Sequence, residues 1–373
     1  MTDVPQTTQA PPESVRPPAK PPAPYELARV SCRELLLLHD NTTTTSVLSA
    51  AIDKTAIAQY ALQCDKAVIR DKGSSLANDA NFTRVNAVFE SVPQEAGLIV
   101  LMHALDFGGG WRLALHRHTG GKGAWLTVKA GVERLFDANP TLAADWLESR
   151  TVEDVAELFQ LPSDSEDELY PFVKKLTNVI TEVGDGVQKA GCLTLADWLM
   201  TRMKYDDDDD DDDNTKNNTP AGDLVEWLVT NFPYTFNDRH QVDGQDVFFY
   251  KKAQLVVGEL YHRFRDENDR FAFADGDRLT AFIDNVICAV CRKLGLVVVT
   301  PTLAAKIDNH EFLPSGSVDE VSLRAAAMDA VEHVAAETGL TPVEVGNYFW
   351  GVLGKTPEFR KYTRHATRDT VFY

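Results

Sequence analysis

The distribution of hydrophobic residues along the chain is typical of a helical protein. Between residues 253 and 264 the apolar positions fall three and four residues apart, which is the spacing of one helix face. The same spacing predicts helices at residues 156–159, 172–180, 193–203, 224–231, 279–294, 325–336 and 343–353. Alternation of period two is rare, and only residues 247–250 and 296–299 are candidates for short strands. The pattern predicts an all-α fold, a compact single helical domain with minor short strands.

Two segments lack this pattern. Residues 1–25 hold eight of the 18 prolines, and residues 204–222 contain eight consecutive aspartates at positions 206–213. Such segments bury too little apolar surface to offset the entropy lost on ordering. We therefore expect a disordered Pro-rich tail and an acidic disordered insertion, the latter within a helical domain at residues 26–373. A docking motif in the tail and a metal site in the aspartate run are less favoured, since nothing fixes those carboxylates in a coordination geometry.

The net charge limits the partners of the protein. The 373 residues carry a formal charge of −19, which is still −11 without the eight consecutive aspartates. Binding of polynucleotides or of anionic membranes relies on a basic surface, so neither is expected here. An anionic small molecule would have to be met by a local basic pocket.

Cysteine content and the N-terminal sequence bear on the cellular compartment. Five cysteines, odd in number and scattered, suit a reducing environment and suggest no disulfide framework. The chain starts without a signal-peptide pattern and holds no run of about 18 uninterrupted apolar residues. We expect a soluble protein of the cytoplasm, with the nucleus as an additional location.

The predicted helix at residues 279–294 holds the first candidate for chemistry. Asp277 is available as its N-cap. Asp284 lies on the flank of the buried stripe, whereas Asn285 and Arg292 point away from it. A carboxylate in that position is partly desolvated and needs a partner. A salt bridge to a neighbouring cation is the structural alternative to a functional role.

Two short motifs near this aspartate have competing interpretations. Cys288-x-x-Cys291 is a weak metal or redox signal without a second pair, so core-lining thiols are favoured. Residues 249–253, Phe-Tyr-Lys-Lys-Ala, open the preceding helix. A lysine at a helix N-terminus, where free N–H groups point outward, can hold a phosphate. Solvated surface lysines are the alternative.

A glycine-rich segment is the third candidate. Asp106-Phe107 precedes three glycines at positions 108–110, and Trp111-Arg112 follows them. Consecutive glycines let a ligand approach the backbone, and Asp106 and Trp111 add a charge and a stacking face. The segment lacks the spacing and the Lys-Ser/Thr pair of dinucleotide or P-loop motifs, and a plain loop is the alternative.

Taken together, these segments resemble the queuosine salvage family, the queuosine 5′-phosphate N-glycosidases, in the form seen in fungal-type members. The order and spacing of the motifs from about residue 30 to residue 373 carry the likeness. They are the central motif Phe-x-Asp-x-x-x-Leu-Thr-x-Phe-x-Asp at 273–284, the segment 247–254, Asn-Phe-Pro at 231–233, Glu-Val-Ser-Leu-Arg at 320–324, Tyr-Phe-Trp at 348–350, the closing segment 365–373, and the glycine segment at 105–112 with Gly-Ala-Trp at 123–125.

The resemblance implies an all-helical fold akin to the helical DNA glycosylases. It also implies hydrolysis of the N-glycosidic bond of queuosine 5′-phosphate, which releases the base queuine for reinsertion into tRNA. By this resemblance Asp284 is the catalytic carboxylate, and Lys251 stands where the family places its active-site lysine. Two features depart from some relatives: Asn285 and Val286 replace a Tyr-Arg pair, and the aspartate insertion is unusual.

The chemistry of such a substrate suits a lone carboxylate. Breaking the bond builds positive charge on the ribose, and a nearby carboxylate stabilises that charge or activates water. Queuine is a 7-deazaguanine and lacks the N7 that purine hydrolases protonate, so more of the barrier has to be lowered on the sugar side. We expect Asp284 to act as general base or electrostatic stabiliser, with a covalent glycosyl intermediate as the variant.

The remaining predicted site residues concern substrate binding. Lys251, helped by Tyr250 or Arg368, is expected to bind the 5′-phosphate or the ribose hydroxyls. The side chains expected to hold the base or to line its pocket are Asp106, Phe107, Trp111, Phe282 and Asn285.

No metal or cofactor motif is visible, so the sequence predicts a reaction with water alone. The expected partner is the small nucleotide rather than DNA or intact tRNA, because polynucleotide binding needs basic surface. A non-catalytic helical scaffold that binds a nucleotide or a protein is the alternative to an enzyme. The sequence does not indicate the oligomeric state.

Overall fold

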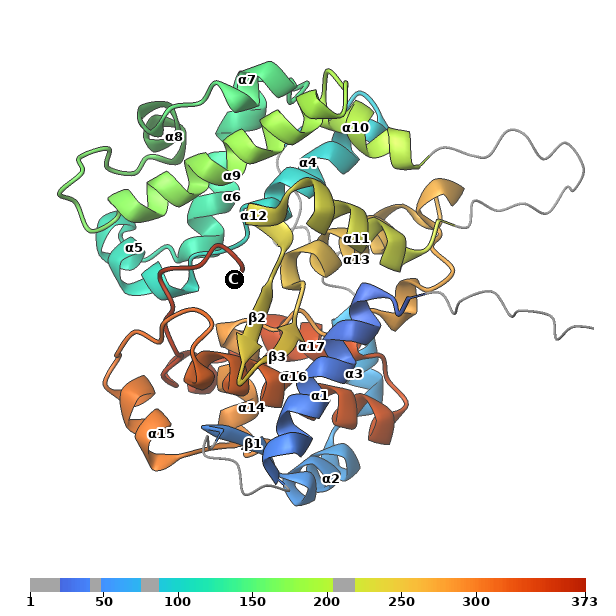
Figure 1. The fold of residues 1–373 in the computed structure, drawn as a ribbon, viewed down its shortest axis with the longest axis vertical. Helices are drawn as coiled ribbons and strands as arrows, with labels where there is room; N and C mark the ends of the chain where they lie inside the picture. The colour runs from blue at the N-terminus through green and yellow to red at the C-terminus, as the bar shows by residue number, and fades with distance from the viewer. Residues whose placement is uncertain (1–20, 41–47, 75–86, 204–218) are drawn as a thin grey trace, which may run out of the picture.

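The computed structural model describes residues 21–40, 48–74, 87–203 and 219–373, most of which are helical (Figure 1). The α-helices are α1 (Pro24–Asp40), α2 (Lys54–Gln63), α3 (Lys66–Ser74), α4 (Val92–Ala104), α5 (Arg112–Thr119), α6 (Ala124–Ala138), α7 (Ala144–Glu148), α8 (Val152–Phe159), α9 (Tyr170–Lys189), α10 (Leu195–Arg202), α11 (Ala221–Asn231), α12 (Pro233–Phe236), α13 (Lys251–Phe264), α14 (Asn285–Lys293), α15 (Pro301–Asp308), α16 (Val318–Thr338), α17 (Pro342–Gly351) and α18 (Pro357–Arg360). Short 3₁₀ turns are η2 (Gly109–Trp111), η3 (Asp269–Phe271), η4 (Gly276–Arg278) and η5 (Leu353–Lys355). The all-α prediction is confirmed.

Four short strands form two antiparallel pairs among the described residues. Strand β1 (Ala50–Ile52) pairs with β4 (Val297–Val299), and β2 (Arg239–Val242) pairs with β3 (Gln245–Phe248) so that Arg239 lies opposite Phe248. The turn of the β2–β3 hairpin is Asp243-Gly244, and both residues have positive φ, which this dipeptide accommodates. Strands were predicted near β3 and β4, whereas β1 and β2 were not predicted.

The predicted helix at residues 279–294 is present only in its second part. Helix α14 begins at Asn285, and Asp277 lies in the 3₁₀ turn η4 instead of capping a helix. In the non-helical segment before α14, Thr280 donates its backbone N–H to Oε1 of Gln254, and its hydroxyl accepts a bond from Nε2 of the same side chain. These bonds satisfy polar groups of Thr280 that a helix would have paired otherwise. Asp284 is the N-cap, a position that aspartate favours over a helix interior.

Two helices begin within the last residues of the predicted low-complexity segments. Helix α1 starts at Pro24, and the hydroxyl of the buried Tyr25 donates to Asp275 at 3.0 Å. The same carboxylate accepts bonds from the backbone N–H groups of Ala221 and Gly222, at 2.5 and 3.2 Å, and so holds the first turn of α11. The rest of the predicted tail and insertion, residues 1–20 and 204–218, lies outside the described residues.

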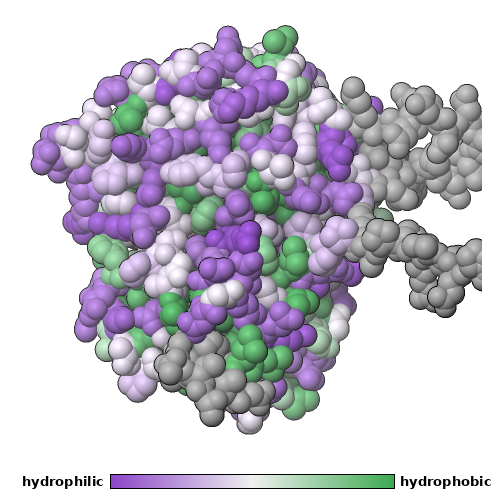
Figure 2. Space-filling view, in the orientation of Figure 1, coloured by the Kyte–Doolittle hydropathy of each residue, from purple (hydrophilic) through white to green (hydrophobic). Residues whose placement is uncertain are grey.

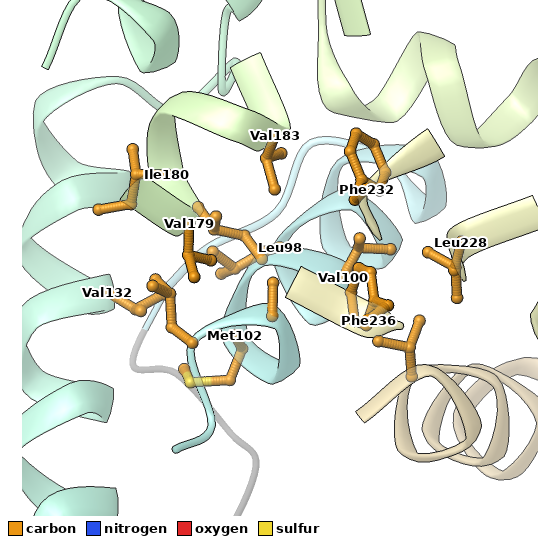
Figure 3. Close-up of a cluster of buried hydrophobic side chains, with 14 of the residues drawn as sticks. Leu98, Val100, Met102, Val132, Val179, Ile180, Val183, Leu228, Phe232 and Phe236 are labelled. Atoms are coloured by element: carbon orange, nitrogen blue, oxygen red, sulfur yellow. The ribbon is translucent and has the colours of Figure 1, made fainter. Parts of the chain in front are cut away.

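The buried hydrophobic side chains form two clusters. The first packs α4, α6, α9 and α11–α13 together, and Figure 3 shows part of it, with Leu98, Val100 and Met102 of α4 facing side chains from the neighbouring helices. The second surrounds α16 and includes side chains from α1, α2, α14 and α17. In Figure 1 α5–α9 form the upper part of the molecule, α1–α3 and α14–α17 form the lower part, and the C-terminus lies between the two.

A fully buried group of charged side chains connects α16 of the lower part to the residues before α13 and to the C-terminal segment. Arg324 of α16 donates to Asp238, at 2.6 and 3.0 Å, and to Glu320, at 3.2 Å. Its guanidinium lies against the rings of Phe249 and Tyr373, 3.9 and 4.4 Å from their centroids. Burial alone would raise the pKa of Asp238, but the Arg324 guanidinium holds that pKa well below its usual range. The C-terminal segment and the residues before α13 are thereby held against α16.

The surface of the molecule is mixed. The face shown in Figure 2 is largely hydrophilic, with hydrophobic side chains in small groups. In the part of the chain that the structure describes, no single helix has the length and apolar character of a membrane span, although α4 and Gly109–Thr119 meet that test jointly as a bent pair.

Candidate active site

Two adjoining cavities lie where residues of both hydrophobic clusters meet. The outer cavity has a volume of about 400 Å³, and the inner cavity has a volume of about 60 Å³. The side chains that line both are Asp106, Trp125, Lys251, Asp284 and Trp350. Asp106 lies between α4 and η2 and Trp125 lies in α6, whereas Asp284 is the N-cap of α14 and Trp350 lies in α17. The strongest sequence candidate therefore lies at the junction of the two cavities.

The carboxylate of Asp284 is held by three hydrogen bonds. Its Oδ1 accepts from the backbone N–H groups of Val286 and Ile287, at 2.8 and 2.9 Å, and caps α14. Its Oδ2 accepts from the indole N–H of Trp350 at 2.8 Å. A carboxylate oxygen has two lone pairs, so Oδ2 keeps one acceptor direction beyond the Trp350 bond. Asp284 was predicted on a helix flank, and its true place at the N-cap fixes its orientation more firmly.

Burial makes this carboxyl group more basic than an ordinary aspartate. Asp284 is 9% exposed, and its desolvation raises the pKa above the usual value. The Lys251 ammonium, the hydrogen bond from Ile287 and the Arg364 guanidinium act in the opposite direction. Among the described residues, no ion pair to Asp284 lies within 4.0 Å, so the simple salt-bridge alternative does not hold. A cavity-facing carboxylate with cations nearby suits a group that meets developing positive charge.

Lys251 is buried rather than solvated. Its ammonium donates to Asp106, at 2.5 Å to Oδ2 and 3.3 Å to the backbone oxygen. Burial alone would raise the pKa of Asp106, but the ammonium and its hydrogen bond hold it below the usual value. Lys252 is buried as well and donates to the backbone oxygen of Ala104 at 2.5 Å. The surface-lysine alternative is therefore wrong, and Lys251 enters the site already paired with a carboxylate.

The three glycines of the segment 108–110 serve packing as much as access. Gly108 has a φ of 109°, which favours glycine. A Cβ on Gly109 would overlap the side chain of Asn285, and one on Gly110 would overlap the backbone of Thr367. Gly109, Phe107 and Asn285 line the outer cavity, as the sequence suggested.

Three predicted binding residues line neither cavity. Trp111 is buried and packs under the guanidinium of Arg368, 4.4 Å from the ring centroid. Arg368 itself is paired with Glu168 at 2.8 Å. Tyr250 packs against Phe248, with 5.6 Å between the ring centroids. These three side chains therefore already have partners within the protein: Trp111 and Arg368 contact each other, Arg368 also pairs with Glu168, and Tyr250 packs on Phe248. Phe282 lines only the inner cavity.

Several cavity residues had no predicted role. Trp350 was noted only as part of a motif, yet it bonds Asp284 directly. The inner cavity adds His103 and Glu259, and burial lowers the pKa of His103 to about 4, which leaves it neutral near pH 7. Besides Lys251, the basic side chains on the wall of the outer cavity are Arg112, His116, Lys355, Arg360 and Arg364. Because residues 112 and 116 lie far from residues 355–364 in the sequence, no sequence motif indicated this group.

The cysteine motif has no place in the site. Cys288 and Cys291 are free, buried thiols in the second cluster, as core-lining residues would be. Within residues 21–40, 48–74, 87–203 and 219–373, no three His, Cys, Asp or Glu side chains gather in a way that would hold a metal ion.

Comparison with known protein families agrees with the motifs. The model of a family described as "Queuosine salvage protein" matches residues 113–373, which include Lys251, Asp284 and Trp350. The chain belongs to this family. Asp106 and Arg112 lie just before the matched region, so the contribution of the glycine segment to the site is seen from the structure.

Relatives from distant organisms carry one name. A protein of Sphaerobacter thermophilus named "Queuosine 5′-phosphate N-glycosylase/hydrolase" is 30% identical over 256 residues, which is 67% of this chain and 72% of the relative. A protein of the same name from Dictyostelium discoideum is 30% identical over 165 residues, 42% of this chain and 49% of that protein. A fungal relative so named, from Schizosaccharomyces pombe, is 23% identical over 159 residues, 42% of this chain and 45% of that protein.

Proposed function

We propose that this chain hydrolyses the N-glycosidic bond of queuosine 5′-phosphate and releases queuine, with Asp284 as the catalytic carboxylate. The observation that carries the proposal is the position of Asp284, a buried carboxylate at the junction of two cavities with Oδ2 only partly occupied. The shared name of the relatives from Sphaerobacter thermophilus and Dictyostelium discoideum supports the choice of substrate.

The proposed chemistry depends on charge. As the bond to the base breaks, positive charge develops at the anomeric carbon, and Oδ2 of Asp284 faces it or directs a water molecule toward it. Charge interactions are stronger in a buried site than in water, so one carboxylate contributes more here than on the surface. Trp350 and the N-terminus of α14 fix both carboxylate oxygens before substrate binds, which reduces the reorganisation needed during the reaction.

Lys251 has a supporting role in this proposal. Its positive charge favours the ionised form of Asp284, the form that is active as a base or stabiliser. Asp106 holds the ammonium at 2.5 Å and so sets its place in the cavity wall. Phe107 and Trp125 offer aromatic surface for the base in the same cavity.

Two routes use the same carboxylate. In one, Asp284 takes a proton from water as the water bonds to the anomeric carbon and the base leaves as an anion, which then takes up a proton. In the other, Oδ2 bonds to that carbon as the base leaves and is protonated by solvent, and water then cleaves the glycosyl ester. Mass spectrometry of protein quenched during turnover distinguishes them, because only the second adds the mass of ribosyl phosphate to the chain.

A non-catalytic scaffold is the competing class. It would have no need to keep a buried carboxylate and its cationic neighbours on a cavity wall, where their desolvation costs free energy. The proposed function is tested by incubating the full chain with queuosine 5′-phosphate, with queuosine-containing tRNA and with guanosine 5′-phosphate, and by measuring free base.

We expect queuine from the first substrate alone. Asp284→Asn should release none at a comparable rate, and Asp246→Asn is its matched control, because Asp246 is paired with Arg239 outside both cavities and should tolerate the change. Absence of any free base in all three incubations would favour the scaffold, and release of queuine from intact tRNA would overturn the choice of substrate.

A further inference from the structure

We infer that Arg112, Arg360 and Arg364 form a subsite for the phosphate monoester of the substrate and decide between nucleotide and nucleoside. This inference rests on the proposed function, since it assigns one end of the same site. The three side chains line the outer cavity together with Asp284, and His116 lies one turn after Arg112 on α5.

The three guanidinium groups line one cavity although their positive charges repel one another. They lie close enough to influence one another: burial and then the charge of Arg360 lower the pKa of Arg112, and the pKa of Arg364 is lowered first by burial and then by both of these arginines. Like charges in one pocket repel, so the arrangement is favourable only if an anion compensates it. In a chain of net charge −19, local clustering of cations is the opposite of the average surface.

The protein supplies little of that compensation itself. Within the described part of the chain, no carboxylate lies within ion-pair distance of Arg112, Arg360 or Arg364, whereas the neighbouring Arg117 and Arg368 both pair with Glu168. Asp284 acts on Arg364 only at longer range. The only side-chain hydrogen bond found for the group runs from Arg364 to the backbone oxygen of Gly354, at 3.3 Å. Most N–H donors of these three side chains are therefore left for a ligand in the cavity that they line.

Phosphate fits these donors better than a carboxylate or a neutral group would. Guanidinium groups bind phosphate oxygens in pairs, and a phosphate monoester carries close to two negative charges at pH 7. His116 remains neutral near pH 7, because burial and the adjacent arginines lower its pKa, and so can add a hydrogen bond without further repulsion.

The position also suits the geometry of a nucleotide. Asp284 and Arg364 line the same cavity and lie close enough that each affects the pKa of the other. A nucleotide places its phosphate one ribose away from the anomeric carbon, so one end can meet the arginines while the other meets Asp284. Lys251 was predicted to bind the phosphate, but its ammonium is already neutralised by Asp106 at 2.5 Å, which makes it the weaker candidate.

The test compares two substrates in four proteins. Wild type, Arg360→Gln, Arg364→Gln and the control Arg117→Gln are assayed with queuosine 5′-phosphate and with queuosine. Arg117 lies on the same helix as Arg112 but outside the cavity, in an ion pair with Glu168. We expect Arg360→Gln to lower kcat/KM for the nucleotide about 10- to 100-fold, chiefly through KM, and to leave the nucleoside unchanged. Arg364→Gln should lower kcat/KM more for the nucleotide than for the nucleoside, since Arg364 also acts on the pKa of Asp284. Equal losses on both substrates, or no loss on either, would overturn the assignment.

A binding measurement separates this inference from the proposed function. Isothermal titration with ribose 5-phosphate and with ribose needs no turnover, so it reports on the subsite even if no queuine is released. Binding of ribose 5-phosphate that Arg360→Gln weakens and Arg117→Gln does not supports the subsite, and binding that is equal in all proteins contradicts it. Arg360 is exposed and no side-chain hydrogen bond is found for it in the described chain, so its variant is expected to fold even if Arg364→Gln does not.

Discussion

Replacing Trp350 with phenylalanine tests how the protein tunes its central carboxylate. The change keeps an aromatic ring on the cavity wall and removes the N–H that donates to Oδ2 of Asp284 at 2.8 Å. A hydrogen bond to a charged group contributes about 1.5–3 kcal/mol. At about 1.4 kcal/mol for each pKa unit, its loss should raise the pKa of Asp284 by about one to two units. The direction is upward because the lost bond stabilises only the ionised form.

The assay is the pH dependence of kcat/KM for queuine release. Because Asp284 must be ionised to act, its titration produces an acid limb, and in the variant this limb should move to higher pH by about one unit or more. Titration of the substrate phosphate is common to both proteins and cancels in the comparison. Trp146→Phe is the control, since Trp146 lies in α7, stacks with Arg150 and lines neither cavity. An unchanged limb, or one moved to lower pH, would refute the reasoning.

Further changes test the electrostatics of the site, the buried charges around Arg324 and the aspartate insertion. Lys251→Met removes a charge that lowers the pKa of Asp284 and should move the acid limb to higher pH, whereas Asp106→Asn should move it lower; shifts of the same sign in the two pH profiles would argue against this electrostatic picture. Arg324→Met removes the guanidinium that pairs with the buried Asp238 and Glu320 and should cost about 3–5 kcal/mol in urea denaturation; a loss below 1 kcal/mol would count against the role of that cluster. Deleting residues 206–213 should leave kcat and KM unchanged, and altered kinetics would show that the insertion contributes.

The helical fold could be predicted because its signal is local. Apolar spacing reports which face of a segment is buried, and α8–α11, α13, α16 and α17 all lie where that spacing placed helices. The hairpin formed by β2 and β3 was missed, although Asp243-Gly244 is a recognised turn signal that would have indicated it. Strand β1 is too short and too far from its partner β4 in sequence for periodicity to reveal it.

The start of α14 shows where spacing misleads. Leu279 and Ile283 are buried although they precede the helix, so the apolar pattern runs past the true N-terminus. The aspartate at 284, directly before the helix, was the competing signal, because its side chain accepts bonds from free N–H groups. The capping preference outweighed the pattern.

The site was predictable in part. Asp284, Lys251 and Asp106 come together as the motifs implied, over 145 residues between Lys251 and Asp106. The roles of Trp111 and Arg368 were not predictable, because a sequence cannot show that an aromatic face is covered by an arginine of the same chain.

The arginine group was hidden for a different reason. Its members on α5 and near the C-terminus converge only through the tertiary fold, which packs the segment after α18 beside the glycine-rich loop. Sequence charge indicated that an anion would need a local basic pocket, and the structure shows which side chains gather to form one.

Turnover by Asp284→Asn is the most direct measurement of the central claim. Asparagine keeps the oxygen that caps α14, so the fold should survive while the charge is lost. The variant should bind queuosine 5′-phosphate in a titration and release queuine about 10³-fold more slowly than wild type, or slower still. Release at a rate close to that of wild type, with binding intact, would contradict the assignment of this carboxylate to the reaction.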